Sequence, residues 1–192
     1  MADRFILLVG GARSGKSDFA VEFAARLGGP TTFLATAEAG DDDMALRIRR
    51  HQYDRPAEWG LVEEPLEVID AVRTIDSDRH LILDCLTLWV SNLMLADRAD
   101  IAITEAAFDL ARVLRSRSGT TLVVSNEVGL GVHPGTSMGG RYRDLLGRVN
   151  RAIADRADRS LFFACGQAIE LTDPYRLIDA DIDPHPPGAE RR

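Results

Sequence analysis

The chain has few of the features that mark several protein classes. Its 192 residues include two cysteines, without a C-x-x-C spacing, and 6% aromatic residues. A domain of this length buries roughly 70% of its unfolded surface and therefore needs no disulfide or metal to support its core. Buried, reduced thiols at Cys85 and Cys165 are favoured over a disulfide or a zinc site.

A long hydrophobic run and an excess of positive charge are also missing. The most apolar stretch, residues 81–95, contains polar residues and is shorter than the roughly 20 residues that a spanning helix needs. Phe5–Val9 is too short for the apolar part of a signal peptide. The 23 basic and 30 acidic residues give a net charge of −7, which disfavours polyanion binding. We expect a cytoplasmic protein without a membrane span and without a nucleic-acid partner.

Lysine is almost absent, because Lys16 is the one basic residue of the 23 that is not arginine. Lysine carries a compact point charge, whereas arginine carries a planar fork. Lys16 lies in a segment that matches G-x-x-x-x-G-K-[ST], directly after an apolar run and at the start of a helical pattern. That position is the structural context in which this motif forms a phosphate-binding P-loop.

The whole P-loop is a candidate phosphate site. Its backbone N–H groups and the helix N-terminus attract the phosphates, Lys16 reaches the β and γ phosphates, and Ser17 is a candidate Mg²⁺ ligand. The residues are Gly10, Gly11, Ala12, Arg13, Ser14, Gly15, Lys16 and Ser17. A second candidate Mg²⁺ ligand is Asp84, which ends an apolar run in the manner of a Walker-B aspartate. A carboxylate at a strand end is also a common helix cap.

Apolar runs alternate with helical patterns along the chain. The expected strands are Phe5–Val9, Thr31–Ala35, His80–Cys85, Thr120–Ser125 and Ser160–Cys165. The expected helices are Lys16–Leu27, with Phe19, Phe23 and Leu27 on one face, Asp42–Gln52, Pro65–Arg73, Ile101–Arg115 and Arg141–Asp158. This alternation predicts an α/β fold of the P-loop NTPase, RecA-like kind: a mostly parallel sheet with helices on both faces. We expect one catalytic domain over residues 1–172, followed by an irregular proline-rich tail, 173–192.

The P-loop predicts nucleotide binding without specifying the reaction. A switch GTPase reads guanine through N-K-x-D, and this motif is excluded because Lys16 is the sole lysine. A motor or helicase is poorly supported, since no basic track for a nucleic-acid strand is present. Transfer of a phosphoryl or nucleotidyl group to a small molecule remains.

His51 follows Met44 and Ile48 at helical spacing, with Arg47, Arg49 and Arg50 on the neighbouring turns. A histidine on an apolar stripe is often a core residue. The flanking arginines also suit a phosphate brought to the ring, so both interpretations stay open on the residues alone.

Several ordered segments together resemble a known family. They are the P-loop, Ala35-Thr36-Ala37, Arg47-Ile48-x-x-His51-x-x-x-Arg55-x-x-x-Trp59, Asp84-Cys85-Leu86-Thr87, Ser125-Asn126-Glu127-Val128-Gly129-x-Gly131, Arg141-x-x-Asp144-x-x-Gly147-x-x-Asn150 and Ala154-Asp155-x-Ala157-Asp158. Over nearly the whole chain the sequence resembles the bifunctional adenosylcobinamide kinases / adenosylcobinamide-phosphate guanylyltransferases of cobalamin biosynthesis. Tyr142, Arg151, the segment 165–171 and the C-terminal extension depart from the family pattern.

The resemblance implies two reactions. ATP or GTP phosphorylates adenosylcobinamide, and GMP is then transferred from GTP to adenosylcobinamide phosphate by way of a histidine that corresponds to His51. It also implies a Mg²⁺ requirement, a homotrimer, and a GTP site that adds further residues to the P-loop. Those residues are Ala35, Thr36, Ala37, Gln52, Tyr53, Asp54, Arg55, Glu63 and Asp84.

Two other functions compete with this interpretation. One is a monofunctional P-loop kinase of a small metabolite, in which His51 is structural. The other is a regulatory protein whose nucleotide site controls a partner surface. Arg55 and Glu63 are equally compatible with solvated surface positions, and Asn126 is compatible with a helix cap or with a contact to the corrinoid acceptor.

Overall fold

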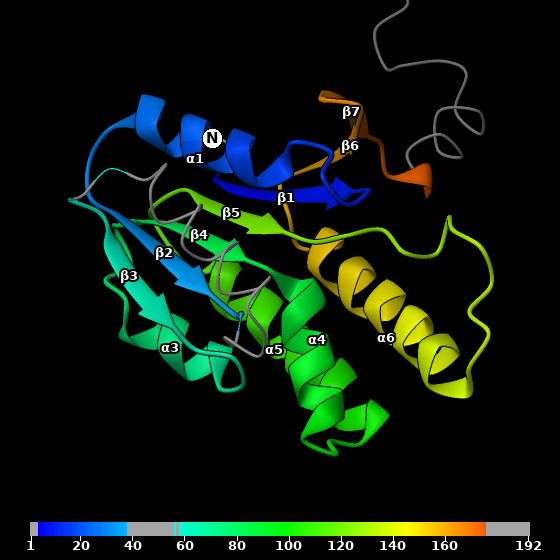
Figure 1. Ribbon diagram of the computed structural model, residues 1–192. Coiled ribbons are helices and arrows are strands. Elements are labelled where there is room, and N and C mark those ends of the chain that lie inside the picture. Colours follow the sequence, from blue (N-terminus) through cyan, green and yellow to red (C-terminus); the bar gives the residue numbers. More distant parts are fainter. Residues whose placement is uncertain (1–3, 38–55, 57, 176–192) are drawn as a thin grey trace, which may run out of the picture.

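The computed structural model describes residues 4–37, 56 and 58–175 (Figure 1). In chain order the elements are β1 (Phe5–Gly10), α1 (Lys16–Leu27), β2 (Thr31–Ala35), β3 (Gly60–Glu63), α3 (Val68–Thr74), β4 (His80–Asp84), α4 (Leu86–Leu95), α5 (Asp100–Arg115), β5 (Thr121–Val124), α6 (Ser137–Ala154), β6 (Arg159–Ala164) and β7 (Gln167–Leu171).

Within the described residues, seven strands form one sheet in the order β3-β2-β4-β5-β1-β6-β7. Every neighbouring pair is parallel except β6 and β7. All six residues of β1 are buried, as expected for a parallel strand covered on both faces. β5 separates β1 from β4, so the strands that end at the P-loop and at Asp84 are not direct neighbours.

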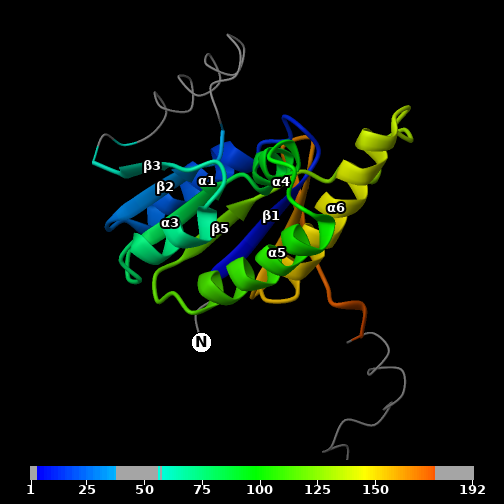
Figure 2. The same ribbon diagram turned by 90° about the horizontal axis from the view of Figure 1, so that it is seen from below.

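Helices cover both faces of this sheet (Figures 1 and 2). Four helices, α3, α4, α5 and α6, pack on one face and form the larger apolar cluster with side chains such as Leu7, Leu83 and Val123. On the other face, α1 packs Ala20 and Ala24 against the smaller cluster. The predicted mostly parallel sheet with helices on both faces is therefore confirmed.

Most expected elements are present, with shifted ends. α1 and β2 have the expected bounds, whereas α3 and α6 begin at Val68 and Ser137, not at Pro65 and Arg141. Thr136 explains the early start of α6, because its hydroxyl accepts a hydrogen bond from the Gly139 N–H and so caps the helix. The expected helix Asp42–Gln52 lies outside the described residues.

The predicted apolar face of α1 is only partly confirmed. Phe19 and Phe23 pack against the smaller cluster, but Leu27 is 45% exposed. The fully buried positions of this helix include Ala20 and Ala24, whose small side chains let the helix approach the sheet closely. Phe19 and Phe23 flank this contact.

Three elements, β3, α4 and β7, have no counterpart among the expected elements. The missed helix α4 lies in the apolar run after β4, where a buried helix resembles a buried strand. Its buried side chains nevertheless follow helical spacing: Leu86, Trp89, Val90, Leu93 and Met94. β3 and β7 are edge strands of four and five residues; β3 alternates between partly buried and exposed positions, and β7 is exposed throughout.

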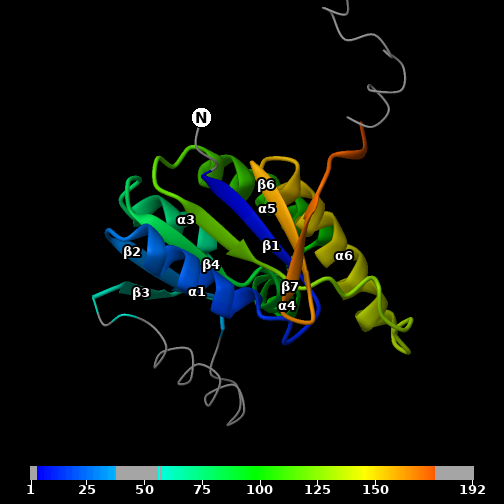
Figure 3. The same ribbon diagram turned by 90° about the horizontal axis from the view of Figure 1, so that it is seen from above.

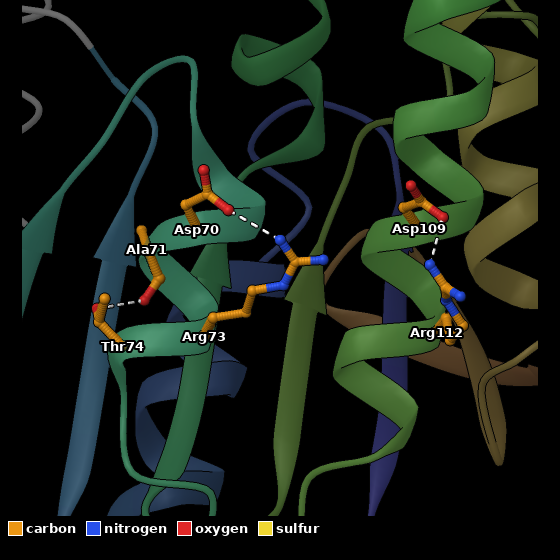
Figure 4. A network of polar contacts seen from close by, with 6 residues as sticks. All are labelled: Asp70, Ala71, Arg73, Thr74, Asp109 and Arg112. Carbon is orange, nitrogen blue, oxygen red and sulfur yellow. Dashed lines mark hydrogen bonds and ion pairs between the residues drawn. The ribbon is translucent and has the colours of Figure 1, made fainter.

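The outer surfaces of α3 and α5 carry short-range ion pairs (Figure 4). Arg73 pairs with Asp70 at 2.9 Å and Arg112 pairs with Asp109 at 2.8 Å, each one helical turn apart. Exposed pairs of this kind contribute little to stability, so the larger apolar cluster holds these helices on the sheet. In the part of the chain that the structure describes, no helix has the length and apolarity needed to span a membrane.

Candidate nucleotide site at the carboxyl edge of the sheet

The P-loop follows β1 and continues into α1 at the carboxyl edge of the sheet. Arg13 and Gly15 have positive φ values of 57° and 94°, which turn the backbone so that the chain curls around an anion site. Gly10 passes so close to β6 that an added Cβ would lie 2.2 Å from the Phe163 carbonyl oxygen. A glycine is therefore required at the start of this loop.

Lys16 lies at the centre of the P-loop and is 5% exposed. Its Nζ donates to the carbonyl oxygens of Gly10 and Gly11 at 3.1 and 2.6 Å, and to Ser14 Oγ at 3.3 Å. Burial lowers the pKa of Lys16, and the negative charge of Asp84 partly opposes this shift. The ammonium group therefore lies in a poorly solvated position where an anionic phosphate would be its natural partner.

The sheet register brings Glu63, Ala35 and Asp84 together although they come from separate parts of the chain. Ala35 pairs with Glu63 on one side and with Asp84 on the other. Asp84 in turn pairs with Val124 of β5, and Val124 pairs with Leu8 of the P-loop strand. The predicted site residues Ala35, Glu63 and Asp84 thus share the edge from which the P-loop emerges.

Thr36 links the ends of β2 and β4. Its Oγ1 accepts a hydrogen bond from the Cys85 N–H at 2.9 Å and donates to the Cys85 carbonyl at 2.7 Å. Asn92 of α4 then donates through Nδ2 to the Thr36 carbonyl at 2.8 Å and to the Pro65 carbonyl at 3.2 Å. Asn92 was not predicted as a site residue, because α4 was not expected. The helical spacing of the apolar residues around Asn92 is the signal that identifies α4.

A second set of hydrogen bonds holds the segment after β5 against the P-loop. The Glu127 N–H donates to the Gly10 carbonyl at 3.0 Å, and the Asn126 N–H donates to Thr87 Oγ1 at 2.8 Å. From α6, Asn150 Nδ2 donates to the Asn126 carbonyl at 3.0 Å. Asn126 is therefore not the cap of α6, which is Thr136.

The oxygen ligands at this edge suit Mg²⁺. Within the described residues, neither Ser17 Oγ nor the Asp84 carboxylate has a hydrogen-bond partner. The same residues contain no cluster of three or more histidine, cysteine, aspartate or glutamate side chains that could hold a metal by themselves. Mg²⁺ in phosphoryl-transfer sites is commonly held by one or two protein oxygens together with the substrate phosphates, and this donor set fits that pattern.

The two cysteines differ from each other. Burial and the neighbouring Asp84 charge raise the pKa of the Cys85 thiol to about 12, against an opposing effect of hydrogen bonds from Leu88 and Thr87. Cys165, expected to be buried, is exposed. This expectation was wrong because β6 ends at Ala164 and Cys165 lies in the turn that follows. Both cysteines are free, as expected.

The structure covers part of the predicted site. It describes the P-loop, Ala35, Thr36, Ala37, Glu63 and Asp84. His51 and the segment Gln52, Tyr53, Asp54 and Arg55 lie outside the described residues.

Sequence comparison identifies similar proteins along most of the chain. A family model described as cobinamide kinase / cobinamide phosphate guanyltransferase matches residues 6–171. The bifunctional adenosylcobalamin biosynthesis protein CobP of Pseudomonas aeruginosa is 42% identical over 166 residues, which cover 86% of this chain and 95% of that protein. Two proteins named CobU, from Salmonella typhimurium and Escherichia coli, are 34% and 30% identical, and each match covers 86% of this chain and 98% of the relative.

Solved structures with the same architecture are more distant in sequence. The RadB recombinase has a TM-score of 0.50 and 14% identity, with 84% of this chain and 74% of that chain covered. An ATPase from a type III secretion system has a TM-score of 0.53 and 11% identity, with 93% of this chain and 61% of that chain covered. At these identities the likeness concerns the fold alone, and it agrees with the predicted P-loop NTPase class.

Proposed function

This chain belongs to the cobinamide kinase / cobinamide phosphate guanyltransferase family, and on that basis we propose that it catalyses two successive reactions. In the first, a nucleoside triphosphate phosphorylates the hydroxyl group of adenosylcobinamide. In the second, GTP supplies GMP to the new phosphate, and adenosylcobinamide-GDP and pyrophosphate are the products. The observation that carries this proposal is the P-loop with its buried Lys16 beside Asp84, in a chain that matches the family model over residues 6–171.

In the kinase step, Lys16 stabilises the negative charge on the γ phosphoryl group as it moves to the acceptor hydroxyl. Ser17 and Asp84 are the proposed Mg²⁺ ligands, because their side-chain oxygens make no hydrogen bond within the described residues. When bound, Mg²⁺ neutralises charge on the phosphates. The P-loop N–H groups hold the remaining phosphates in place.

In the guanylyl step, His51 is the proposed nucleophile. A neutral ring nitrogen attacks the α phosphorus of GTP, so that an N–P bond forms, the bond between the α phosphorus and its bridging oxygen breaks, and pyrophosphate leaves. An oxygen of adenosylcobinamide phosphate then attacks the same phosphorus, and the histidine leaves. Lys16 serves this step by holding the departing pyrophosphate.

The remaining nucleotide contacts follow from the family resemblance and from the arrangement of the edge. Ala35, Thr36, Ala37, Glu63 and Asp84 are proposed to bind GTP. Their placement beside one another at the ends of β2, β3 and β4 supports this assignment. Gln52, Tyr53, Asp54 and Arg55 are proposed to complete the site from the segment that carries His51.

The acceptor is proposed to bind partly at Asn126 and Glu127. Their backbone lies between the P-loop and the start of α4, since the Glu127 N–H reaches Gly10 and the Asn126 N–H reaches Thr87. That position brings the acceptor oxygen near the transferred phosphoryl group. The proposal also includes a catalytic domain over 1–172 with a C-terminal tail, a cytoplasmic location and a homotrimer.

The experiment that tests this function is covalent labelling. The protein is incubated with Mg²⁺ and either α-labelled or γ-labelled GTP, denatured, and its intact mass is measured before and after mild acid. We expect an acid-labile adduct of the mass of GMP that carries the α label alone and is lost in His51→Ala. If GTP binds and no adduct forms, a monofunctional kinase with a structural His51 replaces this proposal.

A further inference from the structure

The turn between β6 and β7 lies against the P-loop, on the side of β1 that faces away from β4 (Figure 3). Ala164 pairs with Gln167, which leaves Cys165 and Gly166 as a two-residue turn with φ values of 53° and 73°. The Gly166 N–H donates to the Ser14 carbonyl at 3.2 Å. An added Cβ on Gly15 would lie 3.8 Å from the Gly166 Cα, so the two loops are in close contact.

The strand order separates two ends of the nucleotide site. β4, which ends at Asp84, lies two positions from β1 on one side, and β6 lies next to β1 on the other. In the kinase step the γ phosphate must face the metal ligand Asp84 and the acceptor. A triphosphate held by Lys16 in that direction points its nucleoside away from Asp84 and toward β6.

The guanylyl step requires the opposite direction. The proposed GTP contacts at Ala35 and Glu63 lie on the β2 and β3 side of the P-loop, so that the nucleoside of GTP lies on that side while its departing pyrophosphate occupies the P-loop. One nucleoside site therefore does not serve both reactions, because each reaction brings a different phosphorus to its acceptor.

We propose that the β6–β7 turn, residues 164–167, binds the base and ribose of the phosphoryl donor in the kinase step. This inference rests on the two-step function proposed above. The turn has the required properties: all four residues are exposed, and three of them, Ala164, Cys165 and Gly166, are small and leave open surface for a purine. The Gln167 side-chain amide has no partner among the described residues. The contact with Ser14 fixes the turn relative to the phosphates.

Cys165 is a natural reporter for this site. Its side chain is exposed, whereas the other cysteine, Cys85, packs against the smaller apolar cluster. A small alkylating reagent therefore reacts with Cys165 in preference to Cys85, because the exposed thiol is the accessible one. The modification is located by mass analysis of peptides.

The alkylation rate of Cys165 is measured with Mg²⁺ alone, with Mg²⁺ and inorganic tripolyphosphate, and with Mg²⁺ and the non-hydrolysable β,γ-imido analogue of ATP. At about ten times its Kd, the analogue is expected to slow alkylation about tenfold, because the free fraction of the protein falls in proportion. Tripolyphosphate fills the phosphate site without a nucleoside and leaves the rate nearly unchanged. Equal protection by both compounds, or by neither, overturns the proposal.

A pair of substitutions on the same hairpin gives a second test. Cys165→Trp places a large side chain in the proposed nucleoside site and is expected to raise the KM for ATP in the kinase step about tenfold with little change in kcat, because uniform binding is lost. Ile169→Trp adds a large side chain on β7 at a position that is 64% exposed, and its KM is expected to match that of the unmodified protein. An unchanged KM in Cys165→Trp, with a melting temperature showing that it folds, contradicts the proposal.

The two proposals fail in different experiments. The GMP adduct on His51 tests the two-step function, whereas protection of Cys165 tests where the kinase donor binds. A missing adduct together with selective protection by the ATP analogue would remove the guanylyl step and keep the nucleoside site.

Discussion

Among single residues, Lys16 takes part in both proposed reactions, because each of them places phosphates at its ammonium group. Three oxygens of the P-loop, from Gly10, Gly11 and Ser14, surround its Nζ. Arginine, which supplies every other basic side chain of this protein, is larger and planar and does not fit such a position. The chemistry of the site therefore explains why this one lysine is present.

Lys16→Ala is expected to lower both the kinase rate and the rate of guanylyl transfer, each by about 100-fold or more, since a preorganised charge next to the reacting phosphates is removed. The two rates are measured in separate assays with adenosylcobinamide and with its phosphate. Arg26→Ala, on the exposed end of the same helix, is the matched control and should leave both rates unchanged. Loss of one activity alone would indicate two independent phosphate sites.

Asn92 acts through other residues and is a positioning residue, and Thr36 has a positioning role in addition to its proposed contact with GTP. Thr36 bonds both backbone polar groups of Cys85, the residue after the metal-ligand candidate Asp84, and Asn92 bonds the Thr36 carbonyl. Groups that orient a metal ligand commonly affect metal affinity by 10-fold to 100-fold. The geometry therefore predicts that these two side chains influence how well Asp84 holds Mg²⁺.

Asn92→Ala is expected to raise the Mg²⁺ concentration for half-maximal activity about tenfold, because Thr36, which bonds the residue after Asp84, loses its link to α4. Activity is titrated with Mg²⁺, and the melting temperature is recorded for the same variant. Ser91→Ala, at the neighbouring position of α4, serves as the control. A lower melting temperature with an unchanged Mg²⁺ requirement would assign Asn92 a purely structural role.

Among the elements, β1 and β6 lie in close contact at Gly10, where the P-loop begins. The added Cβ of an alanine at Gly10 would lie 2.2 Å from the Phe163 carbonyl oxygen and 2.8 Å from its amide nitrogen. These are backbone atoms of a paired strand, and they move only if the sheet register around them is disturbed.

Gly10→Ala is expected to lower the free energy of unfolding by about 3 kcal/mol or more, because a backbone clash in the core belongs to the severe class of substitutions. Chemical denaturation measures the effect. Gly11→Ala is the matched control, since an added Cβ there has no atom within 4 Å and should change stability little. Similar stabilities for the two variants would contradict the close approach of β1 and β6.

Asp158 lies directly before β6 at the opposite edge of the sheet and contacts the start of β1 and the end of α5. Burial raises the pKa of its carboxyl group, but the N–H groups of Phe5 and Arg4 and the guanidinium of Arg115 outweigh this effect and hold the pKa below its ordinary value of 3.8. Both N–H contacts measure 2.9 Å. The carboxylate thereby joins the start of β1 to the end of α5.

Because the folded pKa is lower than 3.8, ionised Asp158 stabilises the fold fully above that pH and loses its contribution as the pH falls through the folded value. Asp158→Asn is expected to lower the free energy of unfolding by about 1 to 2 kcal/mol at neutral pH. The difference should shrink below pH 3.8. Urea titrations over a series of pH values test this, with the exposed neighbour Asp155→Asn as control, and a difference that does not vary with pH would be evidence against the linkage.

For the whole molecule, the prediction concerns the number of chains in the assembly. The family resemblance implies a homotrimer, which for a chain of 21.1 kDa has three times that mass. Sedimentation equilibrium at several protein concentrations measures it directly. A mass equal to that of one chain across the concentration range would contradict the trimer.

Local chemistry was sufficient to predict the elements that contain their own signal. The glycines and Lys16 of the P-loop identify a phosphate site within eight residues, and the run His80–Asp84 identifies a buried strand that ends in a carboxylate. α4 was missed because a helix buried against the sheet is apolar over much of its surface and merges with the strand before it. The start of α6 was misplaced because its cap, Thr136, precedes the apolar pattern.

The sequence was thus enough to predict the P-loop, the family and the α/β class, because each rests on patterns that can be read directly along the chain, and Lys16 and Asp84 stay predicted site residues. The contacts between distant segments emerged from the folded molecule alone. Thr36 meets Cys85 across 49 residues, Asn92 meets Thr36 across 56, and the β6–β7 turn meets the P-loop from the other end of the chain. Such contacts depend on the strand order and on the packing of helices, since nothing in the local pattern of one segment specifies which other segment will lie beside it.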